Sequence, residues 1–462
     1  MEVPGDPTLR SSRQANSCLT PLWRVGLMMG LFMLTGNLGT ATEREVGEPA
    51  PATMLSPRKQ RAVVPPPPSA VSRKMVSSGI AGLPMNRRLR RLGPCSGACE
   101  VNWYAGRLWI RPEYLAWDMK GFALPALLTT GSATTDPSVA GQLDQPDTVT
   151  LFGGGSLAGR LRSGGRLNAG FWCTPRQFQG FELNYFGVQG YDTSYQVDSD
   201  EFAVLARPFQ NATNSQADAQ LIAYPNLLDD DAVVRVDVEL AGTDIFFRKA
   251  MVWTPSIRVD FLSGYRYGRL RDEVHINSSS TSLDAASGEP VDTMVNQQDH
   301  FRMVNNFHGG EVGLLGRWWH GCWSCQILAK VAVGGVQSRY AIRGNTTISE
   351  QIDGVPVPID YEGGLLALPT NMGSDTSYDT SVLSEFGIRL EYQFGTNMRI
   401  ALGYTLLGWT NVMRVSSLID TEINPTQIPP GSLVGVAAPA APSLDRTGFW
   451  AQGLNASWEY QF

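Results

Sequence analysis

Two of the four histidines in this chain stand where they could take part in acid–base chemistry. His275 and His300 fall at the two ends of a long predicted loop, and Asp299 adjoins His300. A hydrolase built on such a group needs a nucleophile or a second acid beside it. The sequence carries no Gly-x-Ser-x-Gly elbow and no His-Glu-x-x-His motif, so we expect no enzyme activity and no resident cofactor or metal.

Cysteine offers a second kind of chemistry. Five cysteines follow the amino-terminal region: Cys95, Cys99, Cys173, Cys322 and Cys325. In an oxidising compartment such residues form disulfides by default, and an odd number leaves one thiol spare. A redox role for the Cys-x-x-Cys pair would need a βαβ setting, which the surrounding sequence lacks. We therefore favour structural disulfides over a metal site.

Charged residues recur at every second position of several segments and alternate with apolar residues. Side chains alternate across a strand, so such a segment has one apolar and one hydrated face. We predict that the charged faces line the interior of a closed barrel, through Arg166, Glu182, Arg235, Asp237, Glu239, Arg258, Asp260, Arg266, Lys330, Glu385, Arg389, Glu391, Arg399 and Glu459. Mixed signs in a narrow lumen favour a salt-bridged core, although a constriction that selects small solutes would use the same residues.

The last nine residues give the clearest example of this alternation. Leu454, Ala456, Trp458, Tyr460 and Phe462 share one face of a predicted strand, and polar residues occupy the other. A lipid-facing strand of a membrane barrel needs this pattern. The aromatic ending, Trp458, Tyr460 and the terminal Phe462, also resembles the signal read by bacterial barrel-assembly machinery.

The same pattern upstream gives ten predicted strands, with twelve or more if loop residues add to them. They lie near residues 107–118, 166–171, 181–185, 234–240, 257–267, 307–317, 326–333, 385–394, 398–406 and 454–462. Short turns near 174–177, 249–253, 318–321 and 395–397 alternate with long loops at about 120–163, 193–230, 277–300, 344–380 and 416–446. This is typical of an antiparallel transmembrane β-barrel in an outer membrane. An even strand count places both chain ends on the periplasmic side.

Composition agrees with a membrane barrel but does not by itself exclude a secreted β-sandwich. Charged residues make up 17% of the 462 residues, against roughly 25% in soluble domains. Recurring aromatic faces on long strands favour the barrel over the sandwich.

The amino-terminal region predicts export. Basic residues precede the apolar run Val25–Leu34, and small residues follow at Gly39 and Ala41, as in a cleavable signal peptide over residues 1–41. Residues 42–94 form a Pro-rich, basic, disordered linker, and residues 95–462 the barrel domain. The linker carries the nine basic residues found between Pro49 and Cys99, with no acidic residue among them. It is either a solvated tether, which we favour, or a contact for an anionic cell-envelope polymer. We expect no nucleic-acid binding.

From about Cys95 onward the chain resembles a bacterial family known as putative β-barrel porin family seven. The matching stretches run in the same order, from Tyr114–Gly121 and Leu124–Gly131 through Gly363–Asn371 and Asn424–Gly431 to Phe449–Asn455. The resemblance implies an outer-membrane barrel and supplies no catalytic residues.

Three functions follow as hypotheses. The first is a narrow porin-like channel or a structural component of the envelope wall, embedded in outer-membrane lipid. The second is a surface-recognition or adhesion protein that acts through its long extracellular loops. The third is an outer-membrane hydrolase.

Overall fold

The computed structural model describes residues 106–157 and 161–462. The predicted signal peptide and linker, and residues 95–105 of the predicted barrel domain, lie outside the described residues. The described part of the chain consists of β-strands, turns and three short 3₁₀ helices. No helix within it is long and apolar enough to cross a membrane.

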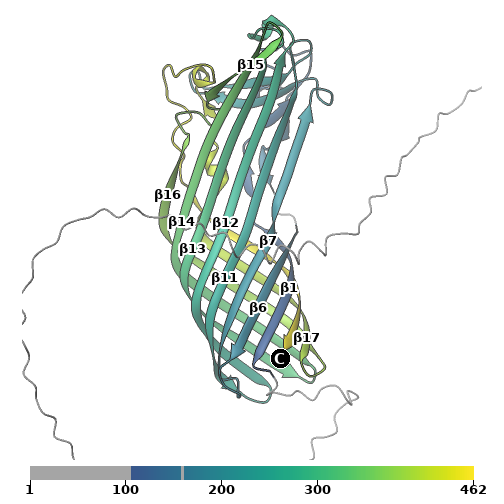
Figure 1. Ribbon diagram of the computed structural model, residues 1–462, viewed down its shortest axis with the longest axis vertical. Helices are drawn as coiled ribbons and strands as arrows, with labels where there is room; N and C mark the ends of the chain where they lie inside the picture. Colours follow the sequence, from purple (N-terminus) through teal and green to yellow (C-terminus); the bar gives the residue numbers. More distant parts are fainter. Residues whose placement is uncertain (1–105, 158–160) are drawn as a thin grey trace, which may run out of the picture. The chain divides into compact units, whose positions relative to one another are not determined.

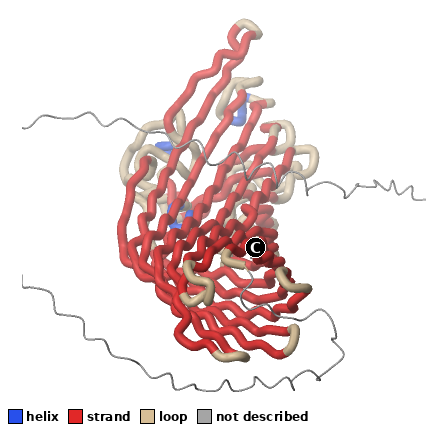
Figure 2. Tube along the Cα trace, turned by 60° about the horizontal axis from the view of Figure 1, so that its bottom comes forward, coloured by secondary structure: helices blue, strands red, loops and turns tan. Residues whose placement is uncertain are grey.

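Ten of the described strands pair in an antiparallel closed ring. In ring order they are β1 (Leu108–Met119), β6 (Arg162–Trp172), β7 (Gln179–Asp198), β11 (Asp231–Trp253), β12 (Ile257–Ser282), β13 (Met294–His320), β14 (Trp323–Ile352), β16 (Gly373–Phe394), β17 (Met398–Met413) and β19 (Arg446–Gln461). The first and last strands close the ring, with Trp109 opposite Gln461. Figures 1 and 2 show the strands running side by side around the barrel. The predicted all-β barrel and its ten strands are confirmed.

The strands differ greatly in length. β1 has 12 residues, whereas β14 has 30, which at about 3.3 Å per residue corresponds to about 100 Å. The apolar band of an outer-membrane barrel is only about 25 Å tall. Even with the tilt of about 35–45° that such strands have, β11 to β14 and β16 are longer than this band requires. Figure 1 shows β12, β13, β14 and β16 as long strands.

Short turns join strands at one end of the barrel, here called the short-turn end. They fall at residues 173–178, 254–256, 321–322 and 395–397. The turn at residues 254–256 was predicted at 249–253, but those residues belong to β11. Two predicted loops, 277–300 and 344–380, were too long. β12 continues to Ser282 and β13 begins at Met294, while β14 continues to Ile352 and pairs with β15 (Val355–Glu362).

The opposite, long-loop end carries additional structure. It includes the small strands β2 (Phe122–Leu124), β3 (Leu128–Thr130), β4 (Val149–Phe152), β5 (Gly155–Leu157), β8 (Leu205–Asn211), β9 (Gln216–Ala223), β10 (Leu228–Asp229) and β18 (Glu422–Ile423). The 3₁₀ helices are η1 (Ala285–Ser287), η2 (Val415–Leu418) and η3 (Pro425–Gln427). β18, β8, β3, β4 and β9 form a separate small sheet, which we call the head sheet.

The barrel wall reverses its polarity along its length. Toward the short-turn end the outward side chains are apolar, as at Phe181, Ile245, Leu314 and Leu402, and the inward ones are charged. Toward the long-loop end the inward side chains are apolar and pack against the loops. The exposed apolar side chains form a belt around the half of the barrel next to the short-turn end. This apolar belt is the surface that suits lipid.

Candidate functional site

The barrel interior at the level of the apolar belt is occupied by a network of buried ion pairs. Arg266 is completely buried, and its guanidinium contacts the carboxylates of Asp244 at 3.2 Å, Glu311 at 2.9 Å and Glu385 at 2.9 Å. The Lys330 Nζ atom reaches the same three carboxylates at 2.6, 3.2 and 3.4 Å. Two cations, from β12 and β14, thus share three acids that come from β11, β13 and β16.

A second cluster lies nearer the short-turn end. The Arg111 guanidinium contacts Glu113 at 2.9 Å, Glu459 at 3.2 Å and Glu182 at 3.6 Å. Arg389 donates a hydrogen bond to Glu113, which joins β16 to β1 across the lumen. Because the paired charges are buried and come from strands that are not neighbours in the ring, the network holds different parts of the barrel wall together.

Little space remains between these side chains. One interior cavity, lined by Arg111, Arg166, Lys330 and their neighbours, has a volume of about 30 Å³. A second, nearer the short-turn end and lined by Arg258, Arg399 and Glu459 among others, has about 40 Å³. Each is near the volume of one water molecule in the liquid, so neither offers a passage for a solute.

The structure places most of the predicted lumen residues inside the barrel. Ten are buried there: Arg166, Glu182, Arg258, Asp260, Arg266, Lys330, Glu385, Arg389, Glu391 and Glu459. Arg399, a little more exposed, binds Glu459 at 3.0 Å. In the network at the level of the belt, sequence reasoning missed six further charges, namely Arg111, Glu113, Asp244, Arg248, Glu311 and Arg317. They continue the same alternation, either within the strands predicted near 107–118 and 307–317 or just beyond the predicted end of the strand near 234–240.

Three of the predicted lumen residues were placed wrongly. Arg235 and Glu239 are exposed and Asp237 is half-buried, all on the outer wall of β11. Their neighbours Val234, Val236, Val238 and Leu240 point inward and are almost completely buried. The prediction assumed that apolar residues always face lipid. In the long-loop half, however, the apolar face packs against the loops that fill the barrel.

The main element of this filling is the segment Leu365–Leu368, which we call the plug. All four of its residues are buried, and they pack into the apolar cluster that includes Phe301 and Trp409. The Asp299 carboxylate of β13 accepts hydrogen bonds from the plug N–H groups of Leu366 at 3.0 Å and Ala367 at 2.7 Å. Asp299 also pairs with Arg207 from the head sheet. One carboxylate therefore ties the wall, the plug and the head together.

A second tie anchors the last long loop. Arg414 donates to the Asp272 carboxylate at 2.6 Å, and both side chains are buried. The side chain of Asn305 accepts from the Met413 N–H at 3.0 Å and donates to its carbonyl at 2.8 Å. The loop that follows β17 is thus fixed to β12 and β13 by buried polar bonds.

His275 and His300 lie on the outer wall, in strands rather than at loop ends. They are directly opposite each other on β12 and β13, with stacked rings whose centroids are 3.9 Å apart. The His300 Nε2 atom lies 3.6 Å from the Glu273 Oε1 atom. This part of the wall lies beyond the apolar belt. Burial lowers the pKa of His300, and the neighbouring His275 imidazole lowers this pKa further. Asp299, grouped with His300 in the sequence, faces the opposite side of the strand.

A cleft opens between the loops at the long-loop end. It has a volume of about 540 Å³ and is lined by the loop residues 136–138, by parts of β9 and β12, and by η1 and the residues after it. Several hydroxyl groups face it, from Ser138, Ser280 and Ser287. Two buried polar atoms in its lining, Thr293 Oγ1 and Gln220 Oε1, have no hydrogen-bond partner in the described part of the chain. Such atoms are costly when unpaired, so the cleft suits a polar ligand.

The structure tests the predicted disulfides for only some of the cysteines. Cys173 and Cys325 are free thiols, whereas the odd number of cysteines predicted a single spare one, so the expected disulfide is absent for one of these two. Cys322 is buried in the turn between β13 and β14, and Cys95 and Cys99 lie outside the described residues. For these three, disulfide pairing stays a prediction.

Trp458 and Phe462 are exposed on the outer wall, and the Tyr460 and Phe462 rings meet edge to face at 4.8 Å.

Comparison with solved structures returns other outer-membrane proteins at low identity. The outer membrane protease OmpT from Escherichia coli is 8% identical, with a TM-score of 0.35, over 77% of this chain and 97% of that one. The toluene transporter TodX from P. putida is 10% identical, with a TM-score of 0.19, over 78% and 90%. Likenesses at this level carry no information about what this chain acts on. No curated protein matches the sequence.

The family comparison is decisive because it covers most of the chain. Residues 109–462 match the family described as Putative beta barrel porin-7, and this range runs from β1 to the terminal Phe462. It contains the ten-stranded ring, the apolar belt and the loops that fill the barrel. The protein is therefore an outer-membrane β-barrel that belongs to the beta barrel porin-7 family.

Proposed function

We propose that this protein is a closed barrel that displays a surface-recognition head, rather than an open solute channel. The filled interior carries the proposal. At the level of the belt the lumen is crossed by paired charges such as Arg266 with Glu385, and above it the plug and head occupy the barrel. A permeable porin needs a continuous aqueous path, which typically takes about 16 strands.

We infer that the long-loop end faces outward and that both chain ends lie on the periplasmic side. The ring begins with β1 and ends with β19 at the short-turn end, and outer-membrane barrels have short periplasmic turns and longer extracellular loops. In this orientation the head and its cleft are exposed to the cell exterior. The apolar belt contacts outer-membrane lipid, and the aromatic carboxyl terminus serves the barrel-assembly machinery.

The cleft is the proposed recognition site, and its chemistry favours an uncharged, hydroxyl-rich ligand such as a surface saccharide. Its lining offers hydroxyl and amide groups together with the unpaired Thr293 and Gln220 atoms. Among the described residues that line it, Asp136 and Glu289 are acidic and none is basic. An anionic ligand would meet only like charge there.

Planar-bilayer recording of the purified chain tests whether the barrel is closed. We expect no conductance steps at concentrations at which a general porin in the same lipid conducts readily. Regular steps from the wild-type protein would contradict the proposal and would favour the narrow channel that the family name suggests.

Saccharide-array binding tests the cleft. We expect the wild-type chain to retain a saccharide that the variants Thr293→Val and Gln220→Leu lose, since each variant removes one unpaired polar atom. Ser374→Ala, exposed on β16 outside the cleft, is the matched control and should bind as the wild type does. Equal binding by all four proteins would show that the cleft is not the site. No hydrolysis of the bound saccharide is expected.

A further inference from the structure

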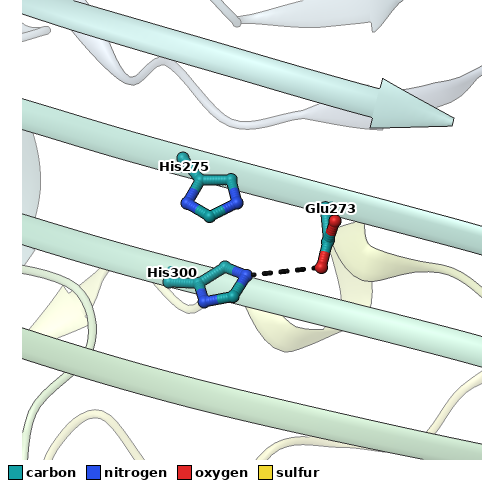
Figure 3. Close-up of side chains that lie close together, drawn as sticks. All are labelled: Glu273, His275 and His300. Atoms are coloured by element: carbon teal, nitrogen blue, oxygen red, sulfur yellow. Dashed lines mark ion pairs between the residues drawn. The ribbon is translucent and has the colours of Figure 1, made fainter. Parts of the chain in front are cut away.

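The outer wall of β12 and β13 brings three potential metal ligands together. Figure 3 shows the two imidazole rings lying one above the other, with the Glu273 carboxylate beside His300. One ligand atom each from Glu273, His275 and His300 can be chosen so that all three lie within 4.8 Å of one another. The three residues are here called the outer-wall triad.

Strand geometry, rather than a flexible loop, sets these positions. His275 and His300 are direct cross-strand partners in the β12–β13 pairing, and Glu273 precedes His275 by two residues on the same face. Side chains directly opposite in an antiparallel pair have Cβ atoms about 5 Å apart, and diagonal neighbours remain within reach. The backbone therefore holds the three side chains in range of one another whatever the conformation of the loops.

The surroundings orient the carboxylate. The Arg271 Nε atom donates to the Glu273 Oε2 atom at 3.0 Å, while the Oε1 atom faces His300 and lies 3.1 Å from the Arg302 Nε atom. The buried Nε2 atom of His300 has no hydrogen-bond partner among the described residues, although it points toward this carboxylate. A basic nitrogen and a carboxylate oxygen thus face each other at 3.6 Å without a hydrogen bond between them.

We propose that the outer-wall triad binds a divalent transition-metal ion of the zinc class through two imidazole nitrogens and one carboxylate oxygen. Two imidazoles with one carboxylate suit zinc, whereas calcium and magnesium prefer sites built from oxygen alone. Donors bound to zinc at about 2.0–2.2 Å lie roughly 3.3–3.5 Å apart in tetrahedral geometry. Side-chain rotation can close the remaining distance, since the strands already align the residues.

Three protein ligands leave a coordination position open to solvent on the outer wall. Water, or a donor from a molecule bound outside the barrel, would complete the sphere. The ion would also join β12 to β13 beyond the belt, where their outward side chains otherwise meet water. Arg271 would act as an orienting neighbour that keeps the carboxylate aimed at the ion.

Calorimetric titration of the refolded full chain in detergent with zinc chloride tests the proposal. We expect one zinc ion per chain, and a stability midpoint in urea that rises when zinc is added, because the ion binds the folded state only. The double variant His275→Ala/His300→Ala should lose both responses. Glu273→Gln, which keeps the shape of the side chain, should bind at least roughly tenfold more weakly.

His308→Ala is the matched control, since His308 is exposed on the outer wall of β13 and hydrogen-bonds to Tyr265 instead of the triad. It should bind zinc as the wild type does. Undiminished stoichiometric binding by the double variant, no binding by the wild type, or equal binding of magnesium would each overturn the assignment. These outcomes are independent of conductance and of saccharide binding.

Discussion

Arg207 of β8 and Asp299 of β13 form a completely buried ion pair between the head sheet and the barrel wall. Asp299 also accepts hydrogen bonds from backbone N–H groups of the plug. Its carboxylate is therefore bound both by a charged guanidinium and by uncharged amides. A buried charge is tolerated when it is paired and hydrogen-bonded in this way, and it becomes costly when one partner is removed. Loss of either charge of this pair is therefore expected to weaken the contact between the head sheet, the plug and the wall.

Asp299→Asn should release the plug. The substitution leaves Arg207 buried without a countercharge, which costs about 3–5 kcal/mol. About 3 kcal/mol would raise the population of an opened plug roughly 100-fold. Limited proteolysis should then cut near residues 363–372 while the barrel keeps its heat-dependent gel migration. Asp375→Asn, exposed on β16, is the control, and equal cutting of both variants would contradict the role of the pair.

Gly364→Ala should open the plug by a purely steric route. A Cβ atom at this position would lie 2.3 Å from the Asp299 Oδ1 atom and 2.6 Å from the Gln298 carbonyl oxygen. Because one of these contacts is backbone, the plug rather than the wall has to move. We expect faster cleavage of the plug but no conductance steps, because the buried ion pairs at the level of the belt still close the lumen. Gly310→Ala on β13, the strand that carries Asp299, meets nothing within 4 Å, and its plug should stay resistant to cleavage.

Arg266→Met should destabilise the whole barrel. Asp244, Glu311 and Glu385 would lose their shared guanidinium and retain Lys330, so three buried carboxylates would have too little positive charge beside them. The expected loss is about 3–5 kcal/mol in the free energy of unfolding, measured by urea titration in lipid vesicles. Arg399→Met provides the comparison, since Arg399 is more exposed and its partner Glu459 also contacts Arg111. Equal losses in the two variants would argue against a central role for Arg266.

Mass mapping of the non-reduced protein tests the cysteines. Cys173 and Cys325 should react with a thiol reagent, since both are free. We expect Cys322 to be bridged to Cys95 or Cys99, because the exported chain meets an oxidising compartment. Alkylation of Cys322 together with Cys95 and Cys99 would reject the bridge.

The ring of strands could be predicted from the sequence because lipid imposes a strict alternation on the belt. Segments such as Phe386–Phe394 and Leu454–Phe462 carry apolar residues at every second position, and each became a strand of the ring. Beyond the belt this signal changes meaning. Val234–Leu240 alternates just as clearly, but its apolar face packs against loops and its charged face meets water. Periodicity alone gives the two faces of a strand and does not say which faces the lumen.

The candidate sites were harder to predict for the same reason. His275 and His300 were read as loop residues because the polar stretch Asn277–Ser282 resembles a loop in sequence. It is instead the end of β12 beyond the belt, where an outward polar residue meets only water. Their cross-strand pairing depends on where the chain turns between Ser282 and Met294, which the pattern does not specify. The Gly363–Asn371 stretch is one of those that carry the family resemblance. Only the structure shows that its residues Leu365–Leu368 form the plug.

The reversal of polarity along the wall predicts where the membrane ends. Leu402 on β17 is 71% exposed and lies in the apolar belt, whereas Tyr378 on β16 is 72% exposed and lies beyond it. Leu402→Arg should therefore place a charge in hydrocarbon and cost about 2–4 kcal/mol, with slower insertion into vesicles. Tyr378→Arg should leave both the insertion rate and the free energy of unfolding nearly unchanged, because its side chain meets water. If the two variants were equally impaired, the belt would have to extend to Tyr378, and the outer-wall triad would then lie much closer to lipid than we infer.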